Sequence, residues 1–135
     1  MRALIVEDDF TSRLLLQKML LPYGEVHVAV DGEEALSAVN AAFGGKEPYD
    51  LVCLDIMMPR RDGHSVLSEI RKIDSEFGRS GLDATKVIMI TAQADSKNVI
   101  RAASSQCEAY LIKPLDKGRL LKELGSLGLI EEKAS

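Results

Sequence analysis

The sequence has few cysteines and no long apolar run. Cys53 and Cys107 are its only cysteines, far apart and in no spacing typical of a metal site, so we expect two reduced thiols. No apolar stretch approaches the length of a membrane span. The first ten residues, MRALIVEDDF, turn acidic too early for a secretory signal peptide. We therefore expect a cytoplasmic protein with no membrane insertion.

An excess of positive charge is also absent. The 135 residues carry a net charge of −4, which argues against a nucleic-acid-binding module, since such modules usually have a basic face. Hydrophobic residues make up 46% and charged residues 28%, which is typical of one globular domain, and there are no internal repeats. The last residues, GLIEEKAS, have the pattern of a frayed polar tail.

Short apolar runs alternate with helical patterns along the chain. Successive strand–helix units favour an α/β fold in which a parallel sheet carries helices on both faces. In such a sheet, ligands and chemistry lie beyond the carboxyl ends of the strands. The expected strands are 2–6, 25–30, 49–55, 86–92 and 109–112, and the expected helices are 11–21, 32–42, 63–77, 95–105 and 117–124.

Four of the five expected strands end in polar residues that can take part in chemistry. Taken singly, each has an ordinary explanation: an acid can cap a helix, and a lysine can be a solvated surface residue. Their coincidence along one edge of a sheet favours a site instead. The residues are Glu7, Asp8 and Asp9 after the first strand, Asp55 at the end of the third, Thr91 after the fourth and Lys113 after the fifth.

Several carboxylates in one crevice need a cation. Two carboxylates about 4 Å apart repel by roughly 4 kcal/mol at an effective dielectric of 20. Oxygen ligands with open positions suit Mg²⁺, which often completes its shell with phosphate. Lys113 adds a fixed positive charge and Thr91 a hydroxyl donor, so the pocket suits a phosphoryl group. A carboxylate can act as a nucleophile that forms an acyl phosphate, and we predict that Asp55 is this acceptor.

Four motifs in this order resemble the receiver domain of two-component response regulators, over residues 2 to 125. They are LIVEDD, LDIMMPRRDG, MITA and YLIKP. The resemblance implies a doubly wound (βα)5 flavodoxin-like fold with five parallel strands in the order 2-1-3-4-5. It also implies a receiver domain over 1–125, followed by a C-terminal tail over 126–135, with no output domain.

The resemblance assigns a role to each strand-end residue. Asp55 would be phosphorylated, and Mg²⁺ would be bound by Asp8 directly, by Glu7 through water and by the backbone carbonyl of Met57. An alignment anchored on Phe10 instead pairs Asp8 with Asp9, which leaves open whether Asp9 rather than Glu7 joins the metal site.

The same resemblance assigns the residues of the switch. Thr91 would supply the hydroxyl that moves to the phosphoryl group, and Tyr110 would be the switch aromatic. Lys113 would pair with the phosphoryl group, and its peptide bond to Pro114 would be cis. Partners would be a sensor histidine kinase or a histidine phosphotransfer protein, and an effector or a second copy at the face of the fourth helix, fifth strand and fifth helix. The domain would be no enzyme beyond Mg²⁺-dependent self-phosphorylation and autodephosphorylation.

Other functions fit the sequence less well. A haloacid-dehalogenase-type phosphatase needs a second Asp two residues after the nucleophile, where this chain has Met57. The first turn, VEDDF, lacks the glycines of a dinucleotide site, and no P-loop spacing occurs. A phosphorylation-independent binding module would not need the complete set of acids, Thr91 and Lys113. We interpret His27 and His64 as an ordinary strand and loop histidine.

Overall fold

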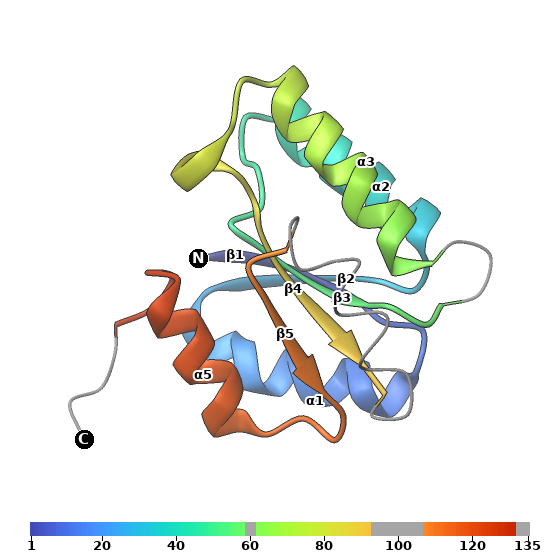
Figure 1. Cartoon of the computed structure of the whole chain (residues 1–135), viewed down its shortest axis with the longest axis vertical. Helices are drawn as coiled ribbons and strands as arrows, with labels where there is room; N and C mark the ends of the chain where they lie inside the picture. Colours follow the sequence, from blue (N-terminus) through green and yellow to red (C-terminus); the bar gives the residue numbers. More distant parts are fainter. Residues whose placement is uncertain (59–61, 93–106, 132–135) are drawn as a thin grey trace.

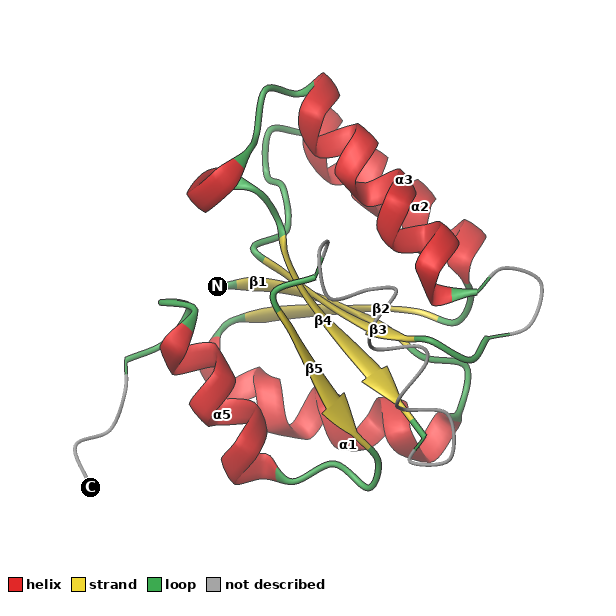
Figure 2. Ribbon diagram, in the orientation of Figure 1, coloured by secondary structure: helices red, strands yellow, loops and turns green. Residues whose placement is uncertain are grey.

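Five parallel strands form one sheet in the order β2-β1-β3-β4-β5 (Figures 1 and 2). This computed structural model describes residues 1–58, 62–92 and 107–131. The predicted fold and strand order are confirmed. The strands are β1 (Arg2–Val6), β2 (Glu25–Ala29), β3 (Leu51–Asp55), β4 (Lys86–Thr91) and β5 (Ala109–Ile112). The helices are α1 (Phe10–Leu20), α2 (Gly32–Gly44), α3 (Gly63–Glu76) and α5 (Lys117–Ser126), with 3₁₀ turns η1 (Leu21–Tyr23) and η2 (Gly81–Asp83).

Each face of the sheet is covered by helices, because side chains alternate between the two faces of a strand. In β1, Leu4 and Val6 belong to the core under α2 and α3, whereas Ala3 and Ile5 belong to the core over α1 and α5. Figure 1 shows the two helix pairs on opposite sides of the sheet. The central strand β3 is buried along its whole length, so its last residue, Asp55, ends inside the protein.

Aspartates start the four described α-helices. Each carboxylate accepts a hydrogen bond from a backbone N–H of the first turn, a contact that is typically worth about 1 kcal/mol. These caps hold the connections at the carboxyl ends of the strands, where the predicted site lies. The four residues are Asp9, Asp31, Asp62 and Asp116.

The last helix is longer than the sequence pattern predicts. α5 continues through Gly125 and ends at Ser126, and Gly128, with φ +75°, turns the chain beyond it. Leu129 and Ile130 then pack against the core over α1 and α5. The tail was therefore wrongly predicted to be frayed at this point, because these two apolar side chains find a place on the sheet.

The described helices include none that is both long and apolar enough to cross a membrane. The helix predicted over 95–105 lies outside the described residues.

Candidate metal centre

The strand register brings the predicted site residues to one edge of the sheet. Val6 pairs with Leu54, so Glu7 and Asp8 leave β1 beside Asp55. Asp55 in turn pairs with Ile90, and Thr91 pairs with Ile112 immediately before Lys113. The carboxyl ends of four neighbouring strands therefore meet, which places residues far apart in sequence around one point.

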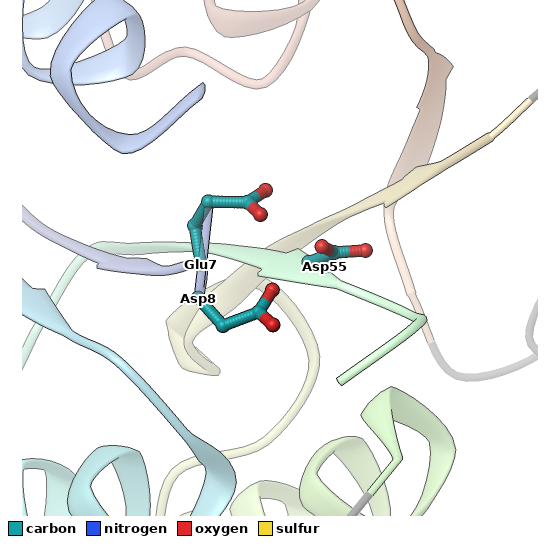
Figure 3. Close-up of side chains that lie close together, drawn as sticks. All are labelled: Glu7, Asp8 and Asp55. Atoms are coloured by element: carbon teal, nitrogen blue, oxygen red, sulfur yellow. The ribbon is translucent and has the colours of Figure 1, made fainter. Parts of the chain in front are cut away.

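Glu7, Asp8 and Asp55 form a compact carboxylate cluster (Figure 3). One oxygen from each side chain lies within 4.8 Å of the other two. Glu7 and Asp55 are buried, whereas Asp8 is exposed to solvent. At this separation, two ionised carboxylates repel by roughly 3 kcal/mol at an effective dielectric of about 20. The cluster is therefore unfavourable when all three groups are ionised and no cation is bound.

Among the described residues, Lys113 supplies a cation to the cluster. Its Nζ lies 3.1 Å from Glu7 Oε2 and 3.3 Å from Asp55 Oδ2. Burial alone would lower the pKa of Lys113, but the nearby Asp55 and Glu7 carboxylates raise it above its ordinary value. The side chain therefore stays charged. The peptide bond between Lys113 and Pro114 is cis.

One ammonium group does not neutralise three carboxylates. The pKa of Glu7 rises to about 7, first because the side chain is buried and then because of the hydrogen bond and charge of Asp55. Glu7 Oε2 is buried, and its contact with Lys113 Nζ at 3.1 Å is an ion pair without hydrogen-bond geometry. Near neutral pH, Glu7 is thus close to half protonated in the metal-free protein, and a cation that displaces this proton would be favoured.

The donors suit a hard divalent cation. All three are carboxylate oxygens, and the exposed position of Asp8 leaves the cluster open to solvent. Asp55 Oδ1 accepts a hydrogen bond of 3.0 Å from the Met57 N–H, which holds the carboxylate in place. The Met57 backbone therefore lies next to the cluster, while its side chain is exposed.

Asp9 lies outside this cluster. Its carboxylate accepts a hydrogen bond of 2.9 Å from the Ser12 N–H at the start of α1, and this bond lowers the pKa of Asp9. Asp9 therefore acts as a helix cap. The geometry groups Glu7, not Asp9, with Asp8. It therefore favours the alignment that assigns Glu7 and Asp8 to the metal site over the alignment anchored on Phe10.

No hydrogen bond between described residues joins Thr91 or Tyr110 to the carboxylates. Thr91 is fully buried, and its hydroxyl donates a hydrogen bond of 3.2 Å to the carbonyl of Ala92. Tyr110 is 44% exposed, with its ring at the surface of β5. The structure therefore brings together Glu7, Asp8, Asp55 and Lys113, while the roles of Thr91 and Tyr110 in a switch stay predictions.

Two residues that support the site were missed by sequence reasoning. Arg13 Nη1 donates a hydrogen bond of 3.0 Å to the Glu7 carbonyl and so holds the end of β1. At Gly63, an added Cβ would lie 2.8 Å from Ile56 Cα and 2.9 Å from the Asp55 carbonyl oxygen. Only glycine lets α3 begin this close to Asp55. No distinguishing signal was present in the sequence, because α2 also begins with a glycine, Gly32, after an aspartate cap.

Comparisons with known proteins agree with this arrangement. A family model described as the response regulator receiver domain matches residues 3–125, and the chain belongs to this family. Receiver domains are phosphoryl-accepting switches of two-component signalling and are not enzymes in the usual sense.

Individual relatives are similar over most of the chain. The probable transcriptional regulator ycf29 of Porphyra purpurea is 33% identical over 125 residues, which are 92% of this chain and 54% of that protein. This chain thus spans about half the length of the curated relatives that it matches.

Solved structures of receiver domains and of a CheY complex are also similar to this chain over most of its length. The CheX–CheY complex with BeF3 and Mg²⁺ from Borrelia burgdorferi contains a chain with a TM-score of 0.77 and 28% identity, and the match covers 94% of this chain and 88% of that one. The CKI1 receiver domain of Arabidopsis thaliana, in complex with Mg²⁺ and BeF3⁻, gives a TM-score of 0.76 and 25% identity, with coverage of 94% and 89%.

Proposed function

We propose that this chain is a phosphorylation-activated signalling switch that accepts a phosphoryl group on Asp55 from a histidine kinase or a histidine phosphotransfer protein. The observation that carries the proposal is the convergence of Glu7, Asp8 and Asp55 around Lys113 at one sheet edge. Of the three carboxylates, Asp55 lies at the end of the most buried strand and faces both Lys113 and the acidic pair.

The transfer is a displacement at phosphorus. An Oδ oxygen of Asp55 forms a bond to phosphorus while the bond from phosphorus to the donor imidazole nitrogen breaks. The nitrogen keeps the electron pair and takes up a proton from solvent, and Asp55 becomes an acyl phosphate. Lys113, 3.3 Å from Asp55 Oδ2, stabilises the charge of the phosphoryl oxygens. Hydrolysis of the acyl phosphate by water returns the free carboxylate, and we propose that this autodephosphorylation resets the switch.

Mg²⁺ is the cofactor that the donor set fits. Asp8 and Asp55 would bind it directly, Glu7 would support it through water, and the Met57 carbonyl would complete the protein ligands. When bound, it supplies positive charge that neutralises the phosphoryl oxygens. Two similar structures, named above, contain Mg²⁺ together with a beryllofluoride group, which supports this assignment.

The signal leaves through the surface. Phosphorylation adds about −1.5 to −2 charges and new acceptor oxygens. Thr91 can exchange its hydrogen bond with the Ala92 carbonyl for one with a phosphoryl oxygen, and Tyr110 on the adjacent strand can then turn inward. An effector or a second copy would bind the face that includes β5, α5 and the fourth predicted helix. This function would be carried out in the cytoplasm.

Phosphorylation by a small donor tests the acceptor. With acetyl phosphate and Mg²⁺, intact-protein mass spectrometry should show one added phosphoryl group that hydroxylamine removes. Asp55→Asn should abolish the adduct. Asp9→Asn is the matched control, because asparagine also caps helices and Asp9 lies outside the cluster; it should be phosphorylated like the wild type. An Asp55→Asn protein that gains the same hydroxylamine-labile group would disprove the assignment.

A further inference from the structure

The connection between α3 and β4, residues 77–85, is held firmly although it carries little regular structure. The hydroxyl of Thr85 donates a hydrogen bond of 2.7 Å to the buried carboxylate of Asp74. Arg79 donates from its Nε to the carbonyl of Asp83, and Lys86 Nζ donates to the carbonyl of Leu82 at 3.0 Å. The turn is therefore anchored at its base and at its tip.

This anchored turn presents an apolar side chain to solvent. Leu82 is 92% exposed, more than any other large apolar side chain of the described residues. Figure 1 shows the turn, coloured yellow, standing out beside the end of α3. Because the backbone carbonyls of Leu82 and Asp83 are already hydrogen-bonded, the turn itself loses little conformational freedom when a partner covers the Leu82 side chain. Leu82 is thus suited to act as an anchor in an interface.

A hollow of about 440 Å³ lies at the base of the same turn. Its lining includes Gly81 and Ala84 from the turn, Cys107 next to β5, and the side chains of Arg71 and Glu108. This volume is within the range of roughly 300–1,000 Å³ that is usual for binding clefts.

Arg71, Glu108 and Asp74 in the wall of the hollow are paired with one another, whereas Arg79, which also lines it, has a buried Nη1 with no hydrogen-bond partner among the described residues. Arg71 Nη2 lies 3.0 and 2.9 Å from the two carboxylate oxygens of Glu108. Arg71 Nη1 lies 3.2 Å from Asp74 Oδ2. Arg71, Glu108 and Asp74 therefore do not require a charged ligand, and an apolar group can enter beside them without leaving these three ions unpaired.

We propose that the occupant is Leu82 of a second copy of this chain, in a two-fold symmetric dimer in which each copy fills the hollow of the other. A two-fold interface uses the same patch on both subunits, so an anchor and its pocket must lie side by side, as Leu82 and the hollow do.

The charges around the turn also favour a second copy. Residues 76–86 carry Glu76 and Asp83 against Arg79 and Lys86, and so have no net charge. The whole chain has a net charge of −4, and two copies that meet through this neutral turn add no like-charge repulsion from its residues.

This dimer is independent of the proposed phosphorylation. The turn precedes β4 and Glu108 precedes β5, so the interface lies at the amino ends of the strands, whereas Asp55 lies at a carboxyl end. Asp55→Asn should therefore dimerise like the wild type, and failure of either proposal would leave the other standing.

Sedimentation equilibrium over a range of concentrations tests the dimer. The wild type should show a monomer–dimer equilibrium, and Leu82→Lys should raise the dissociation constant at least tenfold with an unchanged thermal unfolding curve. Leu21→Lys is the matched control, because Leu21 is also exposed but lies on the other side of the sheet, after α1; it should dimerise normally. A monomeric wild type, or equal dimerisation by the Leu82→Lys protein, would overturn the proposal.

Cross-linking tests the specific contact. In the Leu82→Cys protein, oxidation with copper phenanthroline should join the new thiol to Cys107 of the second copy and give a covalent dimer. The dimer should disappear when Cys107→Ser is added. Persistence of the same dimer in that double variant would show that the turns meet each other and that Leu82 does not enter the hollow.

Discussion

Replacing Glu7 with glutamine should change how the stability of the metal-free protein depends on pH. The pKa of Glu7 is about 7 in the folded protein, against the ordinary value of 4.5 in the unfolded chain. The folded state therefore holds a proton that the unfolded chain has released between these two pH values. Since stability falls with pH wherever the folded state binds more protons, the free energy of unfolding should decrease as pH rises from 4.5 to 7.

The size of the change in unfolding free energy follows from the pKa shift of Glu7. One pKa unit corresponds to 1.36 kcal/mol, so a change from 4.5 to about 7 amounts to roughly 3 kcal/mol above pH 7. Glutamine at position 7 stays neutral at every pH. The Glu7→Gln protein should therefore lose little stability over this range and should exceed the wild type most clearly at pH 8.

Urea unfolding followed by circular dichroism, at pH values from 4.5 to 8 and with EDTA present, measures this difference. Glu76→Gln, at an exposed carboxylate on α3, is the matched control and should keep the wild-type slope. Saturating Mg²⁺ should restore the wild type at pH 8 and help the Glu7→Gln protein less. If the wild-type and Glu7→Gln curves in EDTA run parallel from pH 4.5 to 8, the argument from burial and from Asp55 is wrong.

Two further substitutions test how the cluster is built. Asp8→Ala should weaken Mg²⁺ binding at least tenfold by calorimetry and should stabilise the metal-free fold, because it removes a like charge from the cluster; unchanged Mg²⁺ affinity would remove Asp8 from the ligand set. Gly63→Ala should cost about 1–3 kcal/mol in urea unfolding and should weaken Mg²⁺ binding, because its Cβ meets the backbone of Ile56 and Asp55. Gly44→Ala is the control, since nothing lies within 4 Å of a Cβ there, and a Gly63→Ala protein as stable as this control would contradict the packing argument.

Much of the fold could be predicted because its signals are local. Each strand is a short apolar run, and the aspartate caps mark where four helices begin. The position of the site followed in turn, because parallel strands bring their carboxyl ends to one edge. Glu7, Asp8, Asp55 and Lys113 could thus be grouped from the sequence although they lie up to 106 residues apart.

Other features could not be predicted from the sequence, because they depend on side chains that meet only in the folded protein. The pairing of Arg71 with Glu108 joins residues 37 apart, and neither position differs from an ordinary surface charge in the sequence. Leu129 and Ile130 pack against the core over α1 and α5, which a short apolar pair in a polar tail does not reveal in the sequence. The exposure of Leu82 could not be predicted either, because an isolated leucine in a polar loop gives no periodic signal of which way it faces.

The two ends of the sheet differ in how their charges are satisfied, and this difference bears on how a switch can work. At the amino end, Asp74, Arg71 and Glu108 pair with one another and with the backbone of Thr85 and Val87. At the carboxyl end, Lys113 pairs with Glu7 and Asp55 but with no third carboxylate among the described contacts, and burial raises the pKa of Glu7 to about 7. A change of charge at Asp55 therefore acts on the end whose interactions are still incomplete. At the amino end, Arg2 Nε and Arg79 Nη1 are buried without a hydrogen-bond partner among the described residues, but neither lies beside Asp55, so we expect a rearrangement to begin at the carboxyl end.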